Sequence, residues 1–167
     1  MKTPLVFMGV SGCGKSTAAS RLAKTLGRPF QEGDELHPPA NVQKMRDGQP
    51  LTDADRAPWL RAVGQWLEAH AQDGGIITCS ALKQSYRDTL RAACPPLHFM
   101  LMDVRREELE RRLAARKDHY MPASLLDSQL ATLERPGPRE PISIIDANDD
   151  ADTTQQRVMQ ALGDIED

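Results

Sequence analysis

A glycine-rich segment near the start of the chain holds the residues best suited to chemistry. Residues 9–16 read G-V-S-G-C-G-K-S, which matches the pattern G-x-x-x-x-G-K-[ST]. The glycines permit backbone geometry that larger residues block, so the N–H groups of the loop can point inward at phosphate oxygens. Lys15 is suited to reach the β- and γ-phosphates, and Ser16 to offer its hydroxyl to Mg²⁺. The segment therefore predicts binding of a nucleoside triphosphate.

The surroundings of this segment favour a phosphate loop over a glycine-rich turn with a chance lysine. An apolar run precedes it and a helical pattern follows it, and the N-terminal end of that helix adds to anion binding. The predicted nucleotide contacts are Gly9, Val10, Ser11, Gly12, Cys13, Gly14, Lys15, Ser16 and Thr17.

Two acidic residues, Glu32 and Asp34, follow a short run at residues 30–31. An acid-x-acid pair at the end of a strand can hold Mg²⁺ through water and accept a proton from a substrate hydroxyl. A solvent-exposed turn with two acids is the alternative, and the residues alone leave both open. The N-K-x-D pattern of GTPases does not occur in the sequence.

The pattern of apolar residues predicts an α/β fold that positions these groups. Apolar runs predict buried strands at 4–8, 76–79, 97–102 and 142–145. Helical spacing recurs between them, at 18–26, 52–70, 86–93, 107–117, 124–134 and 153–162. Buried strands that alternate with helices indicate a mostly parallel sheet covered on both faces. The stretch 30–51 is rich in Gly and Pro and predicts an irregular working loop.

Composition limits the class of protein. The chain has 167 residues, 40% hydrophobic and 27% charged, which is typical of one compact domain over residues 1–167. The net charge of −3 argues against a broad nucleic-acid surface, and no apolar run has the length of a membrane span or signal peptide. Three cysteines without a C-x-x-C pattern argue against a disulfide framework or a zinc site and favour a reducing cytoplasm.

A longer pattern downstream of the phosphate loop is more specific. Residues 32–60 read EGDELHPPANVQKMRDGQPLTDADRAPWL, and three shorter segments follow: C-S-A-L-K-x-x-Y-R-D-x-L-R at 79–91, A-R-K-x-H at 115–119 and Q-L-x-T-L-E-x-P at 129–136. Together these segments resemble the gluconokinase family over nearly the whole chain, from Leu5 to Asp146.

The resemblance implies a fold and an activity. The fold is that of nucleoside monophosphate and shikimate kinases: three α/β layers around five parallel strands, a substrate-binding insertion near 35–60 and a small lid near 117–124. The activity is phosphorylation of D-gluconate at its terminal hydroxyl by ATP with Mg²⁺, giving 6-phospho-D-gluconate and ADP. The implied partners are a small-molecule substrate and a second copy in a homodimer, with no nucleic acid and no membrane.

The resemblance also implies roles for individual residues. Asp34 is expected to accept the proton of the attacking hydroxyl, and Arg56 to bind the carboxylate of the sugar acid with its planar guanidinium. Arg116 is expected to enter the lid and close on the transferring phosphoryl, while Arg112 stacks on adenine. The further expected substrate contacts are His37, Ser80, Lys83 and Arg87, and the expected Mg²⁺ site is Ser16 with Glu32 through water.

Several alternatives accompany these assignments. Many members of the family carry Asp where this chain has Glu32, which lengthens the side chain at the metal site. His37 is equally suited to packing against Pro38, and Lys83 with Arg87 to forming a solvated helix face. For the function, the alternatives are another kinase of this fold that acts on shikimate or a nucleotide, and a non-catalytic ATP-binding module.

Overall fold

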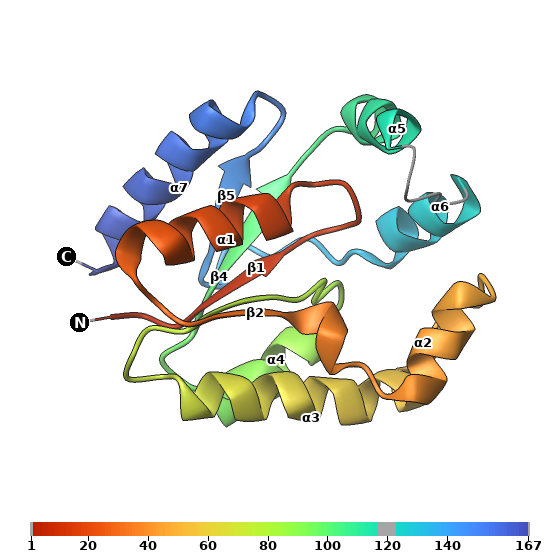
Figure 1. Cartoon of the computed structure of the whole chain (residues 1–167), viewed down its shortest axis with the longest axis horizontal. Helices are drawn as coiled ribbons and strands as arrows, with labels where there is room; N and C mark the ends of the chain where they lie inside the picture. The colour runs from red at the N-terminus through yellow and green to blue at the C-terminus, as the bar shows by residue number, and fades with distance from the viewer. Residues whose placement is uncertain (1, 117–122, 167) are drawn as a thin grey trace.

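A computed structural model describes residues 2–116 and 123–166 of the chain. Its centre is a sheet of five parallel strands in the order β2-β3-β1-β4-β5 (Figure 1). The strands are β1 (Leu5–Met8), β2 (Phe30–Glu32), β3 (Ile76–Thr78), β4 (His98–Asp103) and β5 (Ile142–Asp146). The predicted parallel five-stranded sheet is confirmed.

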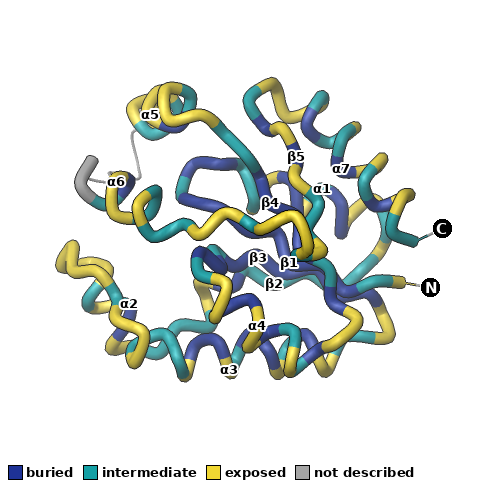
Figure 2. The backbone as a smooth tube through the Cα atoms, turned by 180° about the vertical axis from the view of Figure 1, so that it is seen from behind, coloured by how far each residue is buried: buried dark blue, intermediate teal, exposed yellow. Residues whose placement is uncertain are grey.

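Helices cover both faces of the sheet. On one face lie α1 (Lys15–Leu26) and α7 (Ala151–Glu166), and on the other lie α3 (Asp53–Ala69) and α4 (Gln84–Ala93) (Figure 1). Successive residues of β1 alternate between the two apolar cores, because side chains along a strand point to opposite faces. The three central strands, β3, β1 and β4, are accordingly buried at the centre of the molecule, whereas the edge strands β2 and β5 are partly exposed (Figure 2).

The remaining helices gather at the carboxyl ends of the strands. They are the 3₁₀ helix η1 (Gly33–Leu36), α2 (Pro39–Arg46), α5 (Arg106–Ala115) and α6 (Ala123–Thr132). The two termini lie beside each other at the opposite end, where the backbone N–H of Thr3 donates to Glu166 Oε2 at 3.1 Å (Figure 1). Open parallel sheets bind ligands at the carboxyl ends of their strands, so this edge is where a site is expected.

The prediction of an irregular stretch at 30–51 was wrong in part. The stretch holds β2, η1 and α2. Pro39 is the first residue of α2, a position where the missing N–H of proline has no intrahelical partner to lose. Proline was therefore compatible with a helix start as well as with a loop.

Among the described residues, none of the helices combines the length and the apolar character that a membrane span requires.

The start of α3 follows from the sequence. The side chain of Thr52 accepts a hydrogen bond from the backbone N–H of Asp55 at 3.1 Å, and Asp55 Oδ2 accepts one from Thr52 N–H at 2.9 Å. This reciprocal capping box satisfies two backbone donors that a helix end would otherwise leave unpaired. It fixes the point from which α3 places Arg56 and Trp59.

Candidate active site

The phosphate loop joins β1 to α1 and needs glycine at defined points. Gly9, Gly12 and Gly14 have φ of 143°, 86° and 90°, values that L-residues with side chains rarely adopt. A Cβ at Gly9 would also lie 2.8 Å from Cys13 Sγ. The first N–H groups of α1 directly follow Gly14 and have no partner within the helix, which leaves them available to an anion.

Ser16 and Glu32 meet beside this loop. Ser16 Oγ donates to Glu32 Oε2 at 2.9 Å, and Thr78 Oγ1 donates to the same oxygen at 3.1 Å. Thr78 Oγ1 in turn accepts from the backbone N–H of Gly33 at 3.1 Å. The ends of β2 and β3 thus fix the carboxylate of Glu32 next to the first turn of α1.

A cavity of about 320 Å³ lies next to the phosphate loop. Its walls come from the phosphate loop with the first residue of α1, from η1 and the residue after it, from α2 and the segment between α2 and α3, from α3, from the segment after β3, and from α6. The structure brings six of the predicted residues together in these walls: Ser11, Lys15, Asp34, His37, Arg56 and Ser80. Residues from the loop that binds phosphate and residues expected to bind a substrate therefore share one cavity.

His37 is held flat against Trp59 in this cavity. The two rings stack with centroids 4.3 Å apart and an interplanar angle of 14°. Asn41 Nδ2 lies 3.1 Å from His37 Nδ1, and if that amide nitrogen donates, the proton of a neutral imidazole sits on Nε2. Burial lowers the pKa of His37 below 6.5, Asp34 opposes this effect, and Arg56 adds to it. His37 is thus a neutral imidazole at pH 7 whose second nitrogen can bond a hydroxyl.

Arg56 is oriented by partners that the sequence analysis did not single out. Its Nη1 donates to the backbone oxygen of Leu51 at 2.9 Å and to Tyr86 Oη at 3.1 Å. The Tyr86 hydroxyl donates to Asp53 Oδ1, so a tyrosine and an aspartate lie behind the arginine. Tyr86 lies in the quoted segment 79–91, but its hydroxyl partners come from residues about thirty positions earlier.

Lys83 lies just before α4, close to Arg56. Its Nζ is 3.0 Å from Asp53 Oδ1, and it shares a smaller cavity with Arg56. The hydrogen bond from Lys83 lowers the pKa of Asp53 together with the larger effect of Tyr86. The structure therefore places Lys83 beside Arg56 but outside the cavity of about 320 Å³ that holds Lys15 and Asp34.

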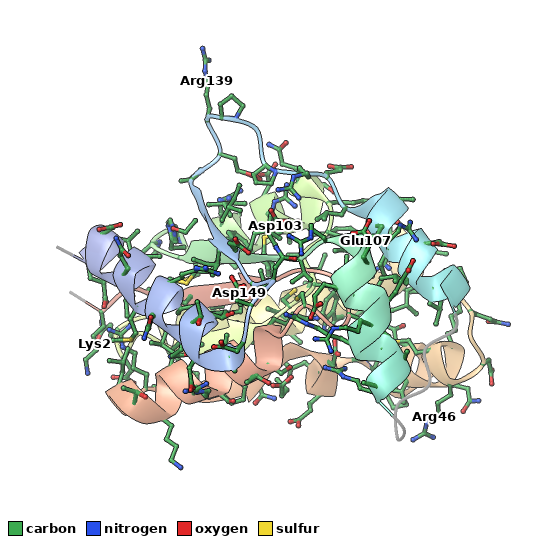
Figure 3. The ribbon with its side chains drawn as sticks, turned by 90° about the horizontal axis from the view of Figure 1, so that it is seen from above. Lys2, Arg46, Asp103, Glu107, Arg139 and Asp149 are labelled. Atoms are coloured by element: carbon green, nitrogen blue, oxygen red, sulfur yellow. The ribbon has the colours of Figure 1, made fainter. Side chains whose placement is uncertain are left out.

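Arg87 is not in the cavity, which contradicts the expectation of a substrate contact. Its side chain is fully buried and pairs with Glu140 at 2.7 Å. Its other nitrogens donate to backbone oxygens of Ala81 and Glu134, both at 2.9 Å. Glu140 belongs to the loop between α6 and β5, from which Arg139 projects outward (Figure 3). Arg87 therefore anchors a distant loop, and a partner 53 residues away gives no local sequence pattern.

A second cavity of about 590 Å³ opens on the other side of the phosphate loop. Gly12, Gly14 and Thr17 form one wall, α5 contributes Arg112, and Arg116 follows at its end. Arg112 Nη1 donates to the backbone oxygen of Gly12 at 3.3 Å and Nε to Glu108 at 3.0 Å. Arg116 is exposed. Of the expected lid near 117–124, residues 117–122 lie outside the described residues.

Helix α6 supplies a wall of the first cavity that the sequence analysis missed. Leu125, Ser128 and Gln129 line it. The side chain of Gln129 accepts from the backbone N–H of Ser11 at 2.7 Å and donates to Ser11 Oγ at 3.2 Å. Gln129 opens the quoted segment 129–136, yet neither its residue type nor its spacing indicated a contact with the phosphate loop.

The donor set near Glu32 fits a cation that shares its ligands with phosphate. In the part of the chain that the structure describes, no three His, Cys, Asp or Glu residues cluster closely enough to hold a metal by themselves. Mg²⁺ in nucleotide sites is held by one or two protein oxygens, waters and phosphate oxygens. The hydroxyl of Ser16 and the carboxylate of Glu32 match that requirement.

Fold and site together define a phosphate-loop kinase. A family model described as an AAA domain matches residues 5–136. The chain belongs to the gluconokinase family: it is 59% identical over 140 residues to the gluconokinase of Gluconobacter oxydans, covering 83% of this chain and 79% of that one.

Solved structures agree with this membership. A gluconokinase from Sinorhizobium meliloti superposes with a TM-score of 0.89 at 41% identity, covering 98% of this chain and 93% of that one. A shikimate kinase from Bacteroides thetaiotaomicron is similar in fold alone, with a TM-score of 0.69 at 17% identity, covering 98% of both chains. The family and the shikimate-kinase-like fold expected from the sequence are confirmed.

Proposed function

We propose that this protein transfers the γ-phosphoryl group of ATP to the terminal hydroxyl of D-gluconate, giving 6-phospho-D-gluconate and ADP. One observation carries the proposal: Lys15 of the phosphate loop lines the same cavity as Asp34 and Arg56. A phosphoryl donor and an alcohol acceptor bound to these groups meet at Lys15. The names of the relatives support gluconate as the acceptor.

The nucleotide is assigned to the phosphate loop and the larger cavity beside it. Residues 9–17 hold the triphosphate through backbone N–H groups and Lys15. Arg112 offers its guanidinium plane to adenine, and Arg116 enters from the end of α5 to neutralise charge on the transferring phosphoryl. Both arginines line the cavity assigned to the nucleotide, which supports these roles.

Mg²⁺ is assigned to Ser16 and Glu32. When bound, the ion neutralises negative charge on the phosphate oxygens. Ser16 would ligate it with the hydroxyl that now donates to Glu32, and Glu32 would hold one of its waters. The longer side chain of glutamate reaches the first turn of α1 because Thr78 holds the carboxylate from behind.

The acceptor is assigned to the smaller cavity. Arg56 binds the carboxylate, while neutral His37 and Ser80 bond the hydroxyls of the chain. Asp34 takes the proton of the terminal hydroxyl as its oxygen bonds to phosphorus and the bond to ADP breaks. Positioning supplies most of the rate in such a transfer, which suits an acid that lies exposed at the cavity.

Two further expectations belong to this proposal. The thiols of Cys13, Cys79 and Cys94 are free and buried, which supports a reducing compartment such as the cytoplasm. A homodimer stays a prediction of the family resemblance, and light scattering of the purified chain tests it.

An acceptor panel tests the proposed reaction. ADP release is measured with Mg-ATP and D-gluconate, shikimate, nucleoside monophosphates or no acceptor. We expect release only with gluconate, and we expect Lys15→Ala to reduce it by orders of magnitude while the circular dichroism spectrum stays native. Turnover of shikimate instead of gluconate, or ATP binding without acceptor-dependent ADP release, would contradict the proposal.

A further inference from the structure

Helix α6 forms one wall of the acceptor cavity, and polar contacts connect it to three other parts of the molecule. At its C-terminal end the backbone N–H of Glu134 donates to Leu82 O at 2.7 Å. On its outer side Asp127 pairs with Arg106 of α5 at 2.6 Å, but both side chains are about half exposed or more, so the pair stabilises little. The contact nearest the site is the one between Gln129 and the phosphate loop.

The amide of Gln129 holds Ser11 at two atoms. Its oxygen accepts from the backbone N–H of Ser11 at 2.7 Å, and its nitrogen donates to the hydroxyl at 3.2 Å. The backbone N–H can only donate, which fixes the amide with its oxygen toward the loop backbone. Ser11 lies within the loop that surrounds the phosphates, four residues before Lys15. A single side chain therefore ties the wall of one cavity to the loop shared with the other.

We propose that Gln129 is a positioning residue that couples nucleotide binding to acceptor binding. A triphosphate on the loop holds Ser11 in one position, and through the two bonds of Gln129 it holds α6 against the acceptor cavity. The acceptor then binds a wall that is already in place, and its affinity rises. Such coupling is reciprocal, so the acceptor raises the affinity for nucleotide by the same factor. This inference rests on the proposed function only for the identity of the acceptor.

The side chain of Gln129 is uncharged, which bears on nucleotide binding as well as on the link to Ser11. A glutamate at position 129 keeps an acceptor for the N–H of Ser11 and can also accept from its hydroxyl, because a serine hydroxyl donates as well as accepts. It would add a negative charge beside a loop that binds a polyanion. Gln129→Glu therefore keeps the mechanical link and weakens nucleotide binding, whereas Gln129→Ala removes the link.

Calorimetry measures the coupling directly. The Kd of D-gluconate is determined with and without saturating Mg²⁺ and a non-hydrolysable ATP analogue. The wild-type chain is expected to bind gluconate roughly 5- to 150-fold more tightly with the analogue, and Gln129→Ala less than about twofold more tightly. Ser128→Ala is the matched control, since Ser128 lines the same wall one residue earlier; it changes the Kd and keeps the ratio. A wild-type ratio of one, or an unchanged ratio in Gln129→Ala, would overturn the proposal.

A second measurement does not depend on the acceptor. Hydrogen exchange of residues 123–132 is followed with and without the Mg²⁺-bound analogue. Protection of this segment on nucleotide binding is expected in the wild type and in Gln129→Glu, and its loss in Gln129→Ala. Gln129→Glu should also bind the analogue several-fold more weakly. If the wild type binds no gluconate, the proposed activity fails, while the exchange experiment still decides the coupling: equal protection in wild type and Gln129→Ala would refute it.

Discussion

Arg56 shows how the charge of a binding residue is kept in place by its neighbours. Its hydrogen bonds to Leu51 and Tyr86 both use Nη1, and within residues 2–116 and 123–166 nothing pairs with Nε and Nη2, which can meet the two oxygens of a carboxylate. Burial and the hydrogen bond to Asp53 raise the pKa of Tyr86 above 10, so its hydroxyl stays protonated. The hydroxyl donates to Asp53 and can therefore accept from Arg56 at the same time. This chain of polar contacts orients the guanidinium before any ligand arrives.

The hydroxyl of Tyr86 is thus expected to support acceptor binding without touching the acceptor. Tyr86→Phe removes one hydrogen bond to Arg56, worth about 1 kcal/mol. Because that bond orients Arg56 equally in ground and transition states, KM for gluconate should rise roughly fivefold with kcat within about twofold. Steady-state kinetics with saturating ATP measure both constants.

A control on the same helix separates orientation from general damage to α4. Thr89→Val removes a hydroxyl that donates to Ser85 O within the helix, and it should leave KM for gluconate unchanged. A fall in kcat at constant KM in Tyr86→Phe would mean that Arg56 acts on the phosphoryl group rather than on the carboxylate.

Among the elements, the contact between the ends of β2 and β3 positions both acids of the site. A Cβ at Gly33 would lie 1.8 Å from the backbone oxygen of Thr78, so β3 comes as close as only glycine allows. The N–H of Gly33 donates to Thr78 Oγ1, and its oxygen accepts from Trp59 Nε1 at 2.8 Å. Glu32 and Asp34 flank this point, which places one acid toward α1 and the other at the acceptor cavity.

We therefore expect Gly33→Ala to lower the free energy of unfolding by about 3 kcal/mol, because the added methyl group meets backbone that cannot turn aside. Urea unfolding followed by circular dichroism measures this change. Gly163→Ala is the control: nothing lies within 4 Å of a Cβ there and the position is helical, so stability should rise by up to ~1 kcal/mol. Equal stabilities of wild type and Gly33→Ala would show that the two strand ends are further apart than described.

The same elements show how far the sequence alone could predict the structure. Local patterns predicted the phosphate loop, the helix that begins near residue 52 and four of the five strands, because each depends on residues close together in the chain. The burial of Arg87 and the contact of Gln129 with Ser11 could not be predicted. Arg87 and Glu140 are 53 residues apart in the chain, and Gln129 and Ser11 are 118 residues apart. Arginine and glutamine side chains are mostly exposed in folded proteins, so their types did not indicate these contacts.

At the scale of the whole molecule, the nucleotide cavity and the acceptor cavity both lie at the carboxyl end of the sheet. The phosphate loop lies between these two cavities. The nucleotide cavity is bounded by α5 and the loop before α7, and the acceptor cavity is bounded by η1, α3 and α6. The termini lie at the far end (Figure 1). The helices at the carboxyl edge are not separate from the body of the molecule, because Leu109 of α5 and Leu126 of α6 belong to the same apolar core as residues of α1 and α7.

Stability of the whole fold is expected to fall as the solution becomes acidic, in two steps. Burial lowers the pKa of His37 and of His98 below 6.5. As pH falls through 6.5 the unfolded chain takes up protons that the folded chain resists, so the free energy of unfolding decreases from about pH 7. The pKa values of Asp55 and Glu108 are lowered to about 2, chiefly by hydrogen bonds from Lys44 and Arg111. Their contribution is complete above the ordinary carboxyl range and is lost between about pH 4.5 and pH 2.

Urea midpoints measured from pH 8 to pH 3 separate the two steps. His98→Gln should flatten the decline between pH 7 and pH 5.5, because the amide nitrogen of glutamine can take the place of His98 Nε2, which lies 2.8 Å from Ser143 Oγ, and does not titrate. The same substitution should leave the decline below pH 4.5 unchanged, since that step belongs to carboxylates paired with Lys44 and Arg111. A wild-type midpoint that rises between pH 7 and pH 5.5 would show that the half-buried imidazoles of His37 and His98 gain a proton on folding instead of resisting one.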